Sequence, residues 1–105
     1  MTKPTALLLA ATMMTATAAL ADAGEDRLKK DGCFACHAID KKVIGPSYKE
    51  VAEKYRNDPG AAAKLADKVK KGGSGVWGPV PMPPNTAVSD ADIKADVAYI
   101  LSLKK

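Results

Sequence analysis

The sequence predicts an all-α domain of about four short helices. Apolar residues recur at spacings of three and four in four stretches, and none of these stretches alternates between apolar and polar residues as a strand would. Capping residues and glycines stand where such helices would begin and end. The chain has 105 residues, 47% hydrophobic and 27% charged, which is enough for one small domain.

The first two helices are predicted on either side of a segment that contains both cysteines. We expect the first over residues 25–33, because it begins with acids and has lysines near its end, as the helix dipole favours. Ser47 and Glu50 form a capping box that predicts a second helix. This helix should continue to about Tyr55.

Two further helices are predicted around a long loop. Asp58 precedes a third helix over residues 61–71, which the following glycines end. Ser89 caps the last helix, whose apolar spacing continues down to Lys104. Residues 72–88 lie between them and are rich in glycine and proline. A loop of this length in so small a domain is usually functional or disordered, and its prolines favour a stiff loop.

Residues 1–21 differ from the rest of the chain. They have a positive start, a short apolar centre and an A-x-A pattern, which are typical of a secretory signal peptide. A retained membrane anchor is the alternative, but the apolar stretch is shorter than the roughly 18 to 20 residues that a span needs. We expect cleavage after Ala21 or Ala23, a mature domain over residues 22–105, a periplasmic location and no stable membrane insertion after processing.

The charge of the mature chain argues against nucleic acid as a partner. Loss of Lys3 with the signal peptide leaves 15 of the 16 basic residues, against 12 acidic ones. The lysines often occur in pairs, with little of the aromatic interleaving that stacks on bases. Such pairs are typical of a solvated surface, and they could also steer the protein toward an acidic patch on a partner.

The mature domain has few residues that could fill a core. Its aromatic residues are one Phe, one Trp and three Tyr. Domains of about 80 residues often need a disulfide, a metal or another cross-link for stability. A large, covalently fixed apolar cofactor would meet this need.

Residues 33–37 form a C-x-x-C-H motif, the attachment pattern of c-type haem. Helical spacing would turn both sulfurs and the imidazole toward one flat object. A structural zinc site is excluded because it needs four ligands and the chain has two Cys and one His. A thioredoxin-like pair lacks its βαβ context, and a disulfide would leave His37 without a role. The motif therefore favours one haem, attached through Cys33 and Cys36 and ligated by His37.

Met82 is the candidate sixth ligand by elimination. The other three methionines lie within residues 1–21, and His37 is the only histidine, so a second His ligand is impossible. A lone methionine in a loop ordinarily fills a gap in a core. The prolines around Met82 would, however, hold its thioether at small entropic cost, which favours the ligand role.

Three segments of the mature region resemble the class I cytochromes c of the small bacterial c-551/c-552 type. They are DGCFACHAID at 31–40, VIGPSYKEVAEKY at 43–55 and KKGGSGVWGPVPMPPN at 70–85. The resemblance implies short helices wrapped around one haem c, with the first and last helices crossing. It also implies thioethers from Cys33 and Cys36, and iron ligation by His37 and Met82.

The same resemblance implies roles for three other residues. The carbonyl of Pro46 should accept a hydrogen bond from His37, and Asn85 should lie near the Met82 sulfur. Trp77 should donate its indole hydrogen to a haem propionate, although a plain core tryptophan is an alternative. The sequence departs from the pattern over residues 85–88, where extra chain leaves the start of the last helix open.

The predicted function is electron transfer, not enzymatic catalysis. An iron with two protein ligands has no open position, and the family implies a monomer that passes electrons between redox proteins. The implied donor is a quinol-oxidising complex or another reductant, and the implied acceptor is an oxidase or a nitrite reductase. The alternative is a five-coordinate haem enzyme or gas sensor with a labile Met82, but the only histidine is already used, which leaves no distal acid or base.

Overall fold

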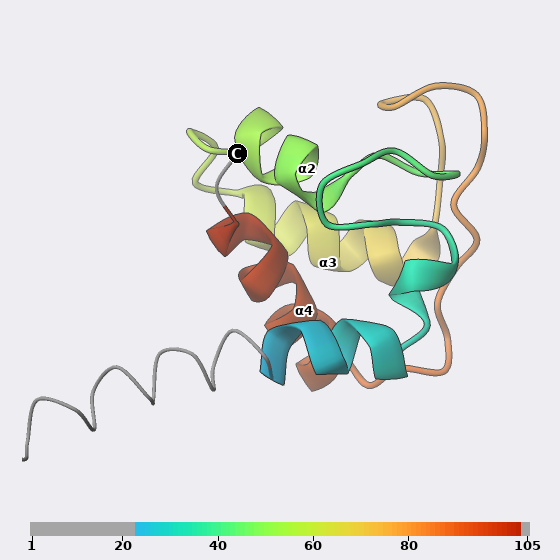
Figure 1. The fold of residues 1–105 in the computed structure, drawn as a ribbon, viewed down its shortest axis with the longest axis vertical. Helices are drawn as coiled ribbons and strands as arrows, with labels where there is room; N and C mark the ends of the chain where they lie inside the picture. Colours follow the sequence, from blue (N-terminus) through green and yellow to red (C-terminus); the bar gives the residue numbers. More distant parts are fainter. Residues whose placement is uncertain (1–22, 104–105) are drawn as a thin grey trace, which may run out of the picture.

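The computed structural model describes residues 23–103, which form helices around a cavity, with no named strand in that range (Figure 1). The elements are an N-terminal helix over residues 23–30, a 3-10 turn η2 over Cys33–Ala35, and the helices α2 (Tyr48–Lys54), α3 (Ala61–Lys71) and α4 (Asp90–Ser102). The predicted all-α class is confirmed. The predicted signal peptide lies outside the described residues.

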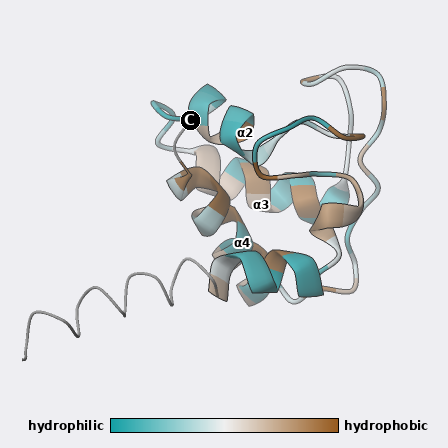
Figure 2. Cartoon of the chain, viewed as in Figure 1, coloured by the Kyte–Doolittle hydropathy of each residue, from teal (hydrophilic) through white to brown (hydrophobic). Residues whose placement is uncertain are grey.

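Helix α4 is the centre of the packing. It contacts both α2 and α3, and the N-terminal helix lies against it at the base of the view in Figure 1. Leu28 of the N-terminal helix and Val97 of α4 are the largest fully buried side chains. Figure 2 shows that α4 carries a long hydrophobic stretch, whereas the N-terminal helix and α2 are largely hydrophilic on the side seen.

Both predicted serine caps are confirmed. The Ser47 hydroxyl accepts a hydrogen bond from the Glu50 amide at 3.1 Å, and Ser89 accepts one from the Asp92 amide at 3.2 Å. Each bond satisfies an amide that the first helical turn leaves unpaired. Helix α4 therefore begins at Asp90, which resolves the start that the sequence left open.

Two predicted helix ends are wrong. The first helix ends at residue 30 and not at residue 33, because Gly32 adopts a left-handed conformation with φ 82° before η2. Helix α4 ends at Ser102, since Leu103 is extended with ψ 144°, and Lys104 lies outside the described residues. The third helix occupies the predicted residues 61–71.

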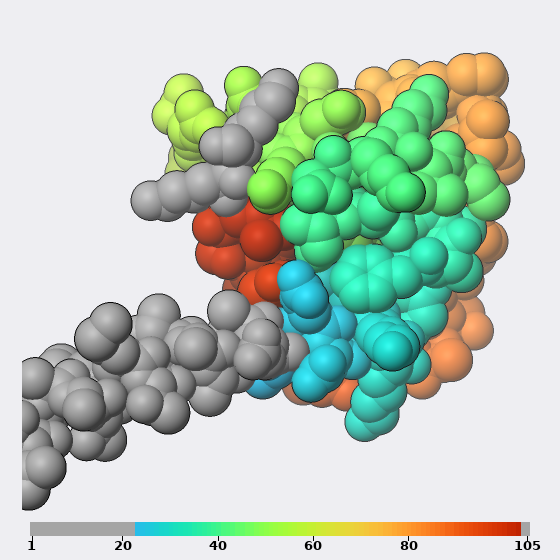
Figure 3. Space-filling view, in the orientation of Figure 1, coloured from blue at the N-terminus to red at the C-terminus, as the bar shows by residue number. Residues whose placement is uncertain are grey.

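A backbone bridge joins the start of the 72–88 loop to Met82 in its second half. Gly73 and Met82 form an isolated antiparallel bridge, in which the Gly73 amide donates to the Met82 carbonyl at 3.0 Å and the Met82 amide donates to the Gly73 carbonyl at 2.8 Å. In the space-filling view, the segment between the N-terminal helix and α2 covers much of the front, and this loop appears at the edge (Figure 3). None of the helices within residues 23–103 has the length and apolar character of a membrane span.

Candidate functional site

A cavity of about 570 Å³ lies between the cysteine-bearing segment, α3, α4 and the 72–88 loop. Its volume is within the roughly 300–1,000 Å³ of small-molecule and cofactor sites. The structure brings all four predicted site residues to its wall: Cys33, Cys36, His37 and Met82. Apolar side chains of α4, among them Ile93 and Val97, line the same space. The residues that the sequence indicated therefore converge on one cavity.

The orientation of His37 is fixed by its surroundings. Its Nδ1 lies 2.8 Å from the carbonyl oxygen of Pro46, which confirms the expected contact. Since a carbonyl only accepts, Nδ1 carries the proton and Nε2 keeps its lone pair for a metal. Gly45 packs directly on the imidazole, and a Cβ at that position would overlap the ring. The hydrogen bond and the packing thus hold the imidazole in one orientation.

The Tyr48 ring packs against the His37 ring, a contact that the sequence alone does not predict. The two rings stack with centroids 4.8 Å apart and an interplanar angle of 20°. Tyr48 is buried, and burial, followed by the neighbouring Cys33 thiol, raises the pKa of its hydroxyl far above its usual range. It remains neutral at any physiological pH. Its only signal in the sequence is its place after the capping Ser47, on the buried side of α2.

The two thiols are half-buried and free in the structure. Burial, and then the charge of Asp96, raises the pKa of the Cys33 thiol. Cys33 is therefore not an activated thiolate of the kind that thiol oxidoreductases use. This property argues against the thiol oxidoreductase alternative.

Met82 is positioned by backbone contacts on both sides of the loop. Besides the bridge to Gly73, its carbonyl is approached closely by Gly72, where a Cβ would overlap the carbonyl oxygen. Gly72 has φ 73° and ψ −170°, a region that is essentially restricted to glycine. The glycines that end α3 thus also set the path of the chain to Met82.

We expect Gly72→Ala to destabilise the haem-loaded protein by about 1–3 kcal/mol, or more if the overlap moves the Met82 backbone. Gly60→Ala is the matched control, because Gly60 has φ −93° and the nearest atom to an added Cβ is 3.4 Å away. The control should cost less than about 1 kcal/mol. Denaturant unfolding measures both, and equal losses would contradict the role given to Gly72.

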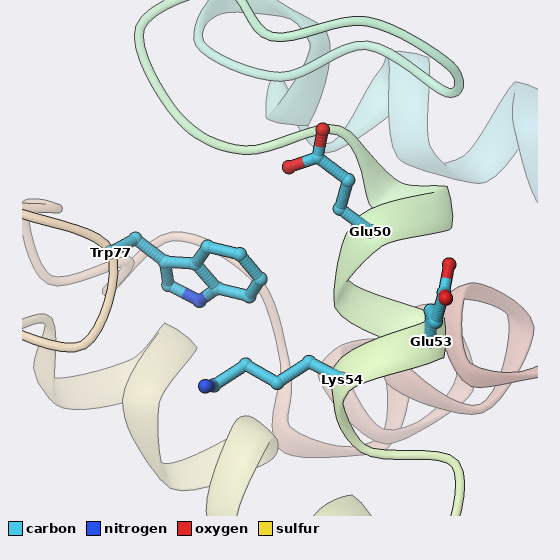
Figure 4. A pocket seen from close by; sticks show the side chains of 4 residues that line it. All are labelled: Glu50, Glu53, Lys54 and Trp77. Carbon is cyan, nitrogen blue, oxygen red and sulfur yellow. The ribbon is translucent and has the colours of Figure 1, made fainter.

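Trp77 and Asn85 make contacts other than the expected ones. Trp77 is 41% exposed, and the Lys54 ammonium lies 5.4 Å from its ring centroid, a cation–π contact at a shallow pocket that Glu50 also lines (Figure 4). The Asn85 side-chain oxygen accepts bonds from the amides of Ala87 and Val88, both at 3.3 Å. Their predicted roles toward a propionate and the Met82 sulfur stay predictions.

The residues at the cavity fit a c-type haem. Two thiols and an imidazole with a free nitrogen share one short segment, a thioether comes from a separate loop, and the wall between them is largely apolar. Comparison with known proteins decides the matter. The family model of cytochrome c matches residues 21–104.

The chain belongs to the cytochrome c family. The cytochrome c-551 of Pseudomonas aeruginosa is 50% identical, over 97% of this chain and 99% of its own length. The cytochrome c-552 of Nitrosomonas europaea is 53% identical, over 83% of this chain and 84% of its own. The crystal structure of the wild-type Nitrosomonas europaea cytochrome c552 matches with a TM-score of 0.74 and 54% identity, covering 76% of this chain and 99% of the other.

These similarities confirm the small c-551/c-552 type and its all-α class I fold. As a cytochrome c with two cysteines, the protein carries one covalently attached haem c. It is a small electron-carrier cytochrome, which implies redox proteins as its partners.

Proposed function

We propose that this cytochrome c is a periplasmic carrier of single electrons, with its haem attached through Cys33 and Cys36 and its iron ligated by His37 and Met82. The observation that carries the proposal is the convergence of these four side chains on one cavity, with His37 Nε2 left free by the bond to Pro46. The bound haem would supply the one-electron couple of its iron.

The protein residues would set how readily the iron is reduced. The Pro46 carbonyl orients the His37 ring and raises its basicity as a ligand. Met82 offers a soft, weakly basic thioether, and His/Met ligation raises the reduction potential. With His37 and Met82 both bound to the iron, the haem would offer no site to substrate or oxygen. Electron transfer is then the reaction that the site supports.

The surface near the cavity suits brief contact with redox partners. Four large apolar residues form part of the cavity wall, so an apolar rim would surround the bound haem: Ile44, Val76, Trp77 and Val80. Lys42 and Lys68 also line the cavity. We propose that the protein acts as a monomer and that its redox partners dock on this surface. The donor would be a quinol-oxidising complex or another reductant, and the acceptor would be an oxidase or a nitrite reductase. Steering by lysines would make the association rate fall with salt.

Voltammetry of the haem-loaded protein tests the carrier function. We expect one reversible one-electron wave whose height does not grow when oxygen, hydrogen peroxide or nitrite is added, because no axial position is open. A catalytic current with any of these would instead support the haem enzyme with a labile Met82.

We also propose that residues 1–21 are a signal peptide and that residues 22–105 are the mature protein. The mass of the haem-loaded protein recovered from the periplasm should correspond to a start at Asp22 or Gly24. A mass that retains residue 1 would contradict the proposal.

A further inference from the structure

A charged cluster joins the N-terminal helix to α4 at the wall of the haem cavity. The Arg27 Nε donates to the Asp96 Oδ1 at 2.8 Å, and the two residues are 69 positions apart in the chain. The Asp96 side chain is only 8% exposed, and Asp96 also lines the cavity. Two helices that cross at the base of Figure 1 thus meet around a buried carboxylate next to the cofactor.

A second carboxyl lies beside this ion pair. Asp31 follows the N-terminal helix, and its side chain is within hydrogen-bonding reach of Asp96. Its Oδ2 is buried and has no hydrogen-bond donor among residues 23–103. Two ionised carboxylates are acceptors only, so a bond between them requires a proton on one of them. One arginine also balances only one of the two negative charges.

We propose that Asp96, next to the buried Asp31 carboxyl, takes up a proton beside the haem cavity and that binding of this proton is coupled to the electron that the haem carries. This inference rests on the proposed attachment of haem in the cavity. Reduction of the bound haem by a donor protein would remove one positive charge from the site, so Asp96 would take up a proton from water more readily. On oxidation, the electron leaves to the acceptor and the proton tends to return to water.

The surroundings of Asp96 raise the pKa of its carboxyl to near neutral pH. Burial, and then Asp31, raises the pKa of Asp96 to about 7, although Arg27 opposes the shift. From α2, Tyr48 faces Asp96 and stays neutral, since its own pKa is raised. Cys33 also faces Asp96, and its sulfur would be bound in a thioether. From α3, Lys68 lines the same cavity.

The reduction potential of the haem-loaded protein, measured from about pH 5 to pH 9, tests the coupling. We expect the potential to fall by about 20–60 mV as the pH rises through the pKa of Asp96. This range corresponds to a roughly two- to tenfold difference in proton affinity between the two oxidation states, at about 59 mV per tenfold. Asp96→Asn and Asp31→Asn should remove this fall.

Asp67→Asn is the control, because Asp67 forms an exposed ion pair with Lys71 on α3. It makes the same change of charge and should keep the fall. Redox difference infrared spectra give a second readout: a protonated-carboxyl band should appear in the parent and vanish in Asp96→Asn. Asp31→Asn leaves the Arg27–Asp96 ion pair intact. If Asp96→Asn fails to fold, the pH dependence of the potential can therefore still be compared between the parent and Asp31→Asn.

Two results would overturn the coupling without touching the carrier function. One is a reversible wave whose potential does not change with pH. The other is an equal pH dependence in the parent and in a folded Asn variant, which would assign the titration to the haem's own carboxylates. Absence of any reversible wave would instead contradict the proposed function itself.

Discussion

Replacing both Cys33 and Cys36 with alanine should release the haem and unfold the domain. The core that remains is small, since the fully buried apolar side chains centre on Leu28 and Val97. A cavity of about 570 Å³ left without its cofactor would cost on the order of 10 kcal/mol, as an upper bound, at roughly 24 cal/mol per Å³. That cost is comparable with the whole stability of a typical domain, about 5–15 kcal/mol.

Extraction into acidic acetone and far-ultraviolet circular dichroism measure the two effects. The double variant should lose its pigment and most of its helical signal. The single variants Cys33→Ala and Cys36→Ala are the matched controls, because each keeps one thioether and should keep its pigment during extraction. A double variant that stays folded without pigment would show that the haem is not needed to fill the core.

Replacing Met82 with alanine should lower the reduction potential by on the order of 0.1 V, within the roughly 0.8 V range that axial ligands set. The loss of the thioether removes a ligand that favours ferrous iron and admits water in its place. Voltammetry measures the change. Val43→Ala is the control, since Val43 is 46% exposed, lies outside the cavity wall and has no sulfur. Equal potentials in the parent and in Met82→Ala would contradict ligation by Met82.

The helix starts could be predicted from the sequence because their causes are local. Ser47 and Ser89 accept hydrogen bonds from amides three residues ahead, so the cap and its partner lie within one turn. The C-x-x-C-H motif is equally local. The acids and lysines of the first helix do not indicate where it ends, because the left-handed backbone of Gly32 stops the helix before the last apolar position.

Other parts of the site depend on contacts that no local pattern reveals. The bridge between Gly73 and Met82 joins two loop positions through backbone atoms alone. The stacking of Tyr48 on His37 depends on how the cysteine-bearing segment packs against α2. The Arg27–Asp96 ion pair joins opposite ends of the chain, and each residue by itself looks like an ordinary charge on a helix surface.

The visible spectrum of the haem-loaded protein, followed by addition of carbon monoxide to the reduced form, tests the central claim most directly. Ligation by His37 and Met82 predicts a weak far-red band of sulfur-bound ferric iron in the oxidised protein and little reaction of the reduced protein with carbon monoxide. Absence of that band together with ready binding of carbon monoxide would contradict the claim. The iron would then have an open position, and the protein would act as a haem enzyme or a gas sensor.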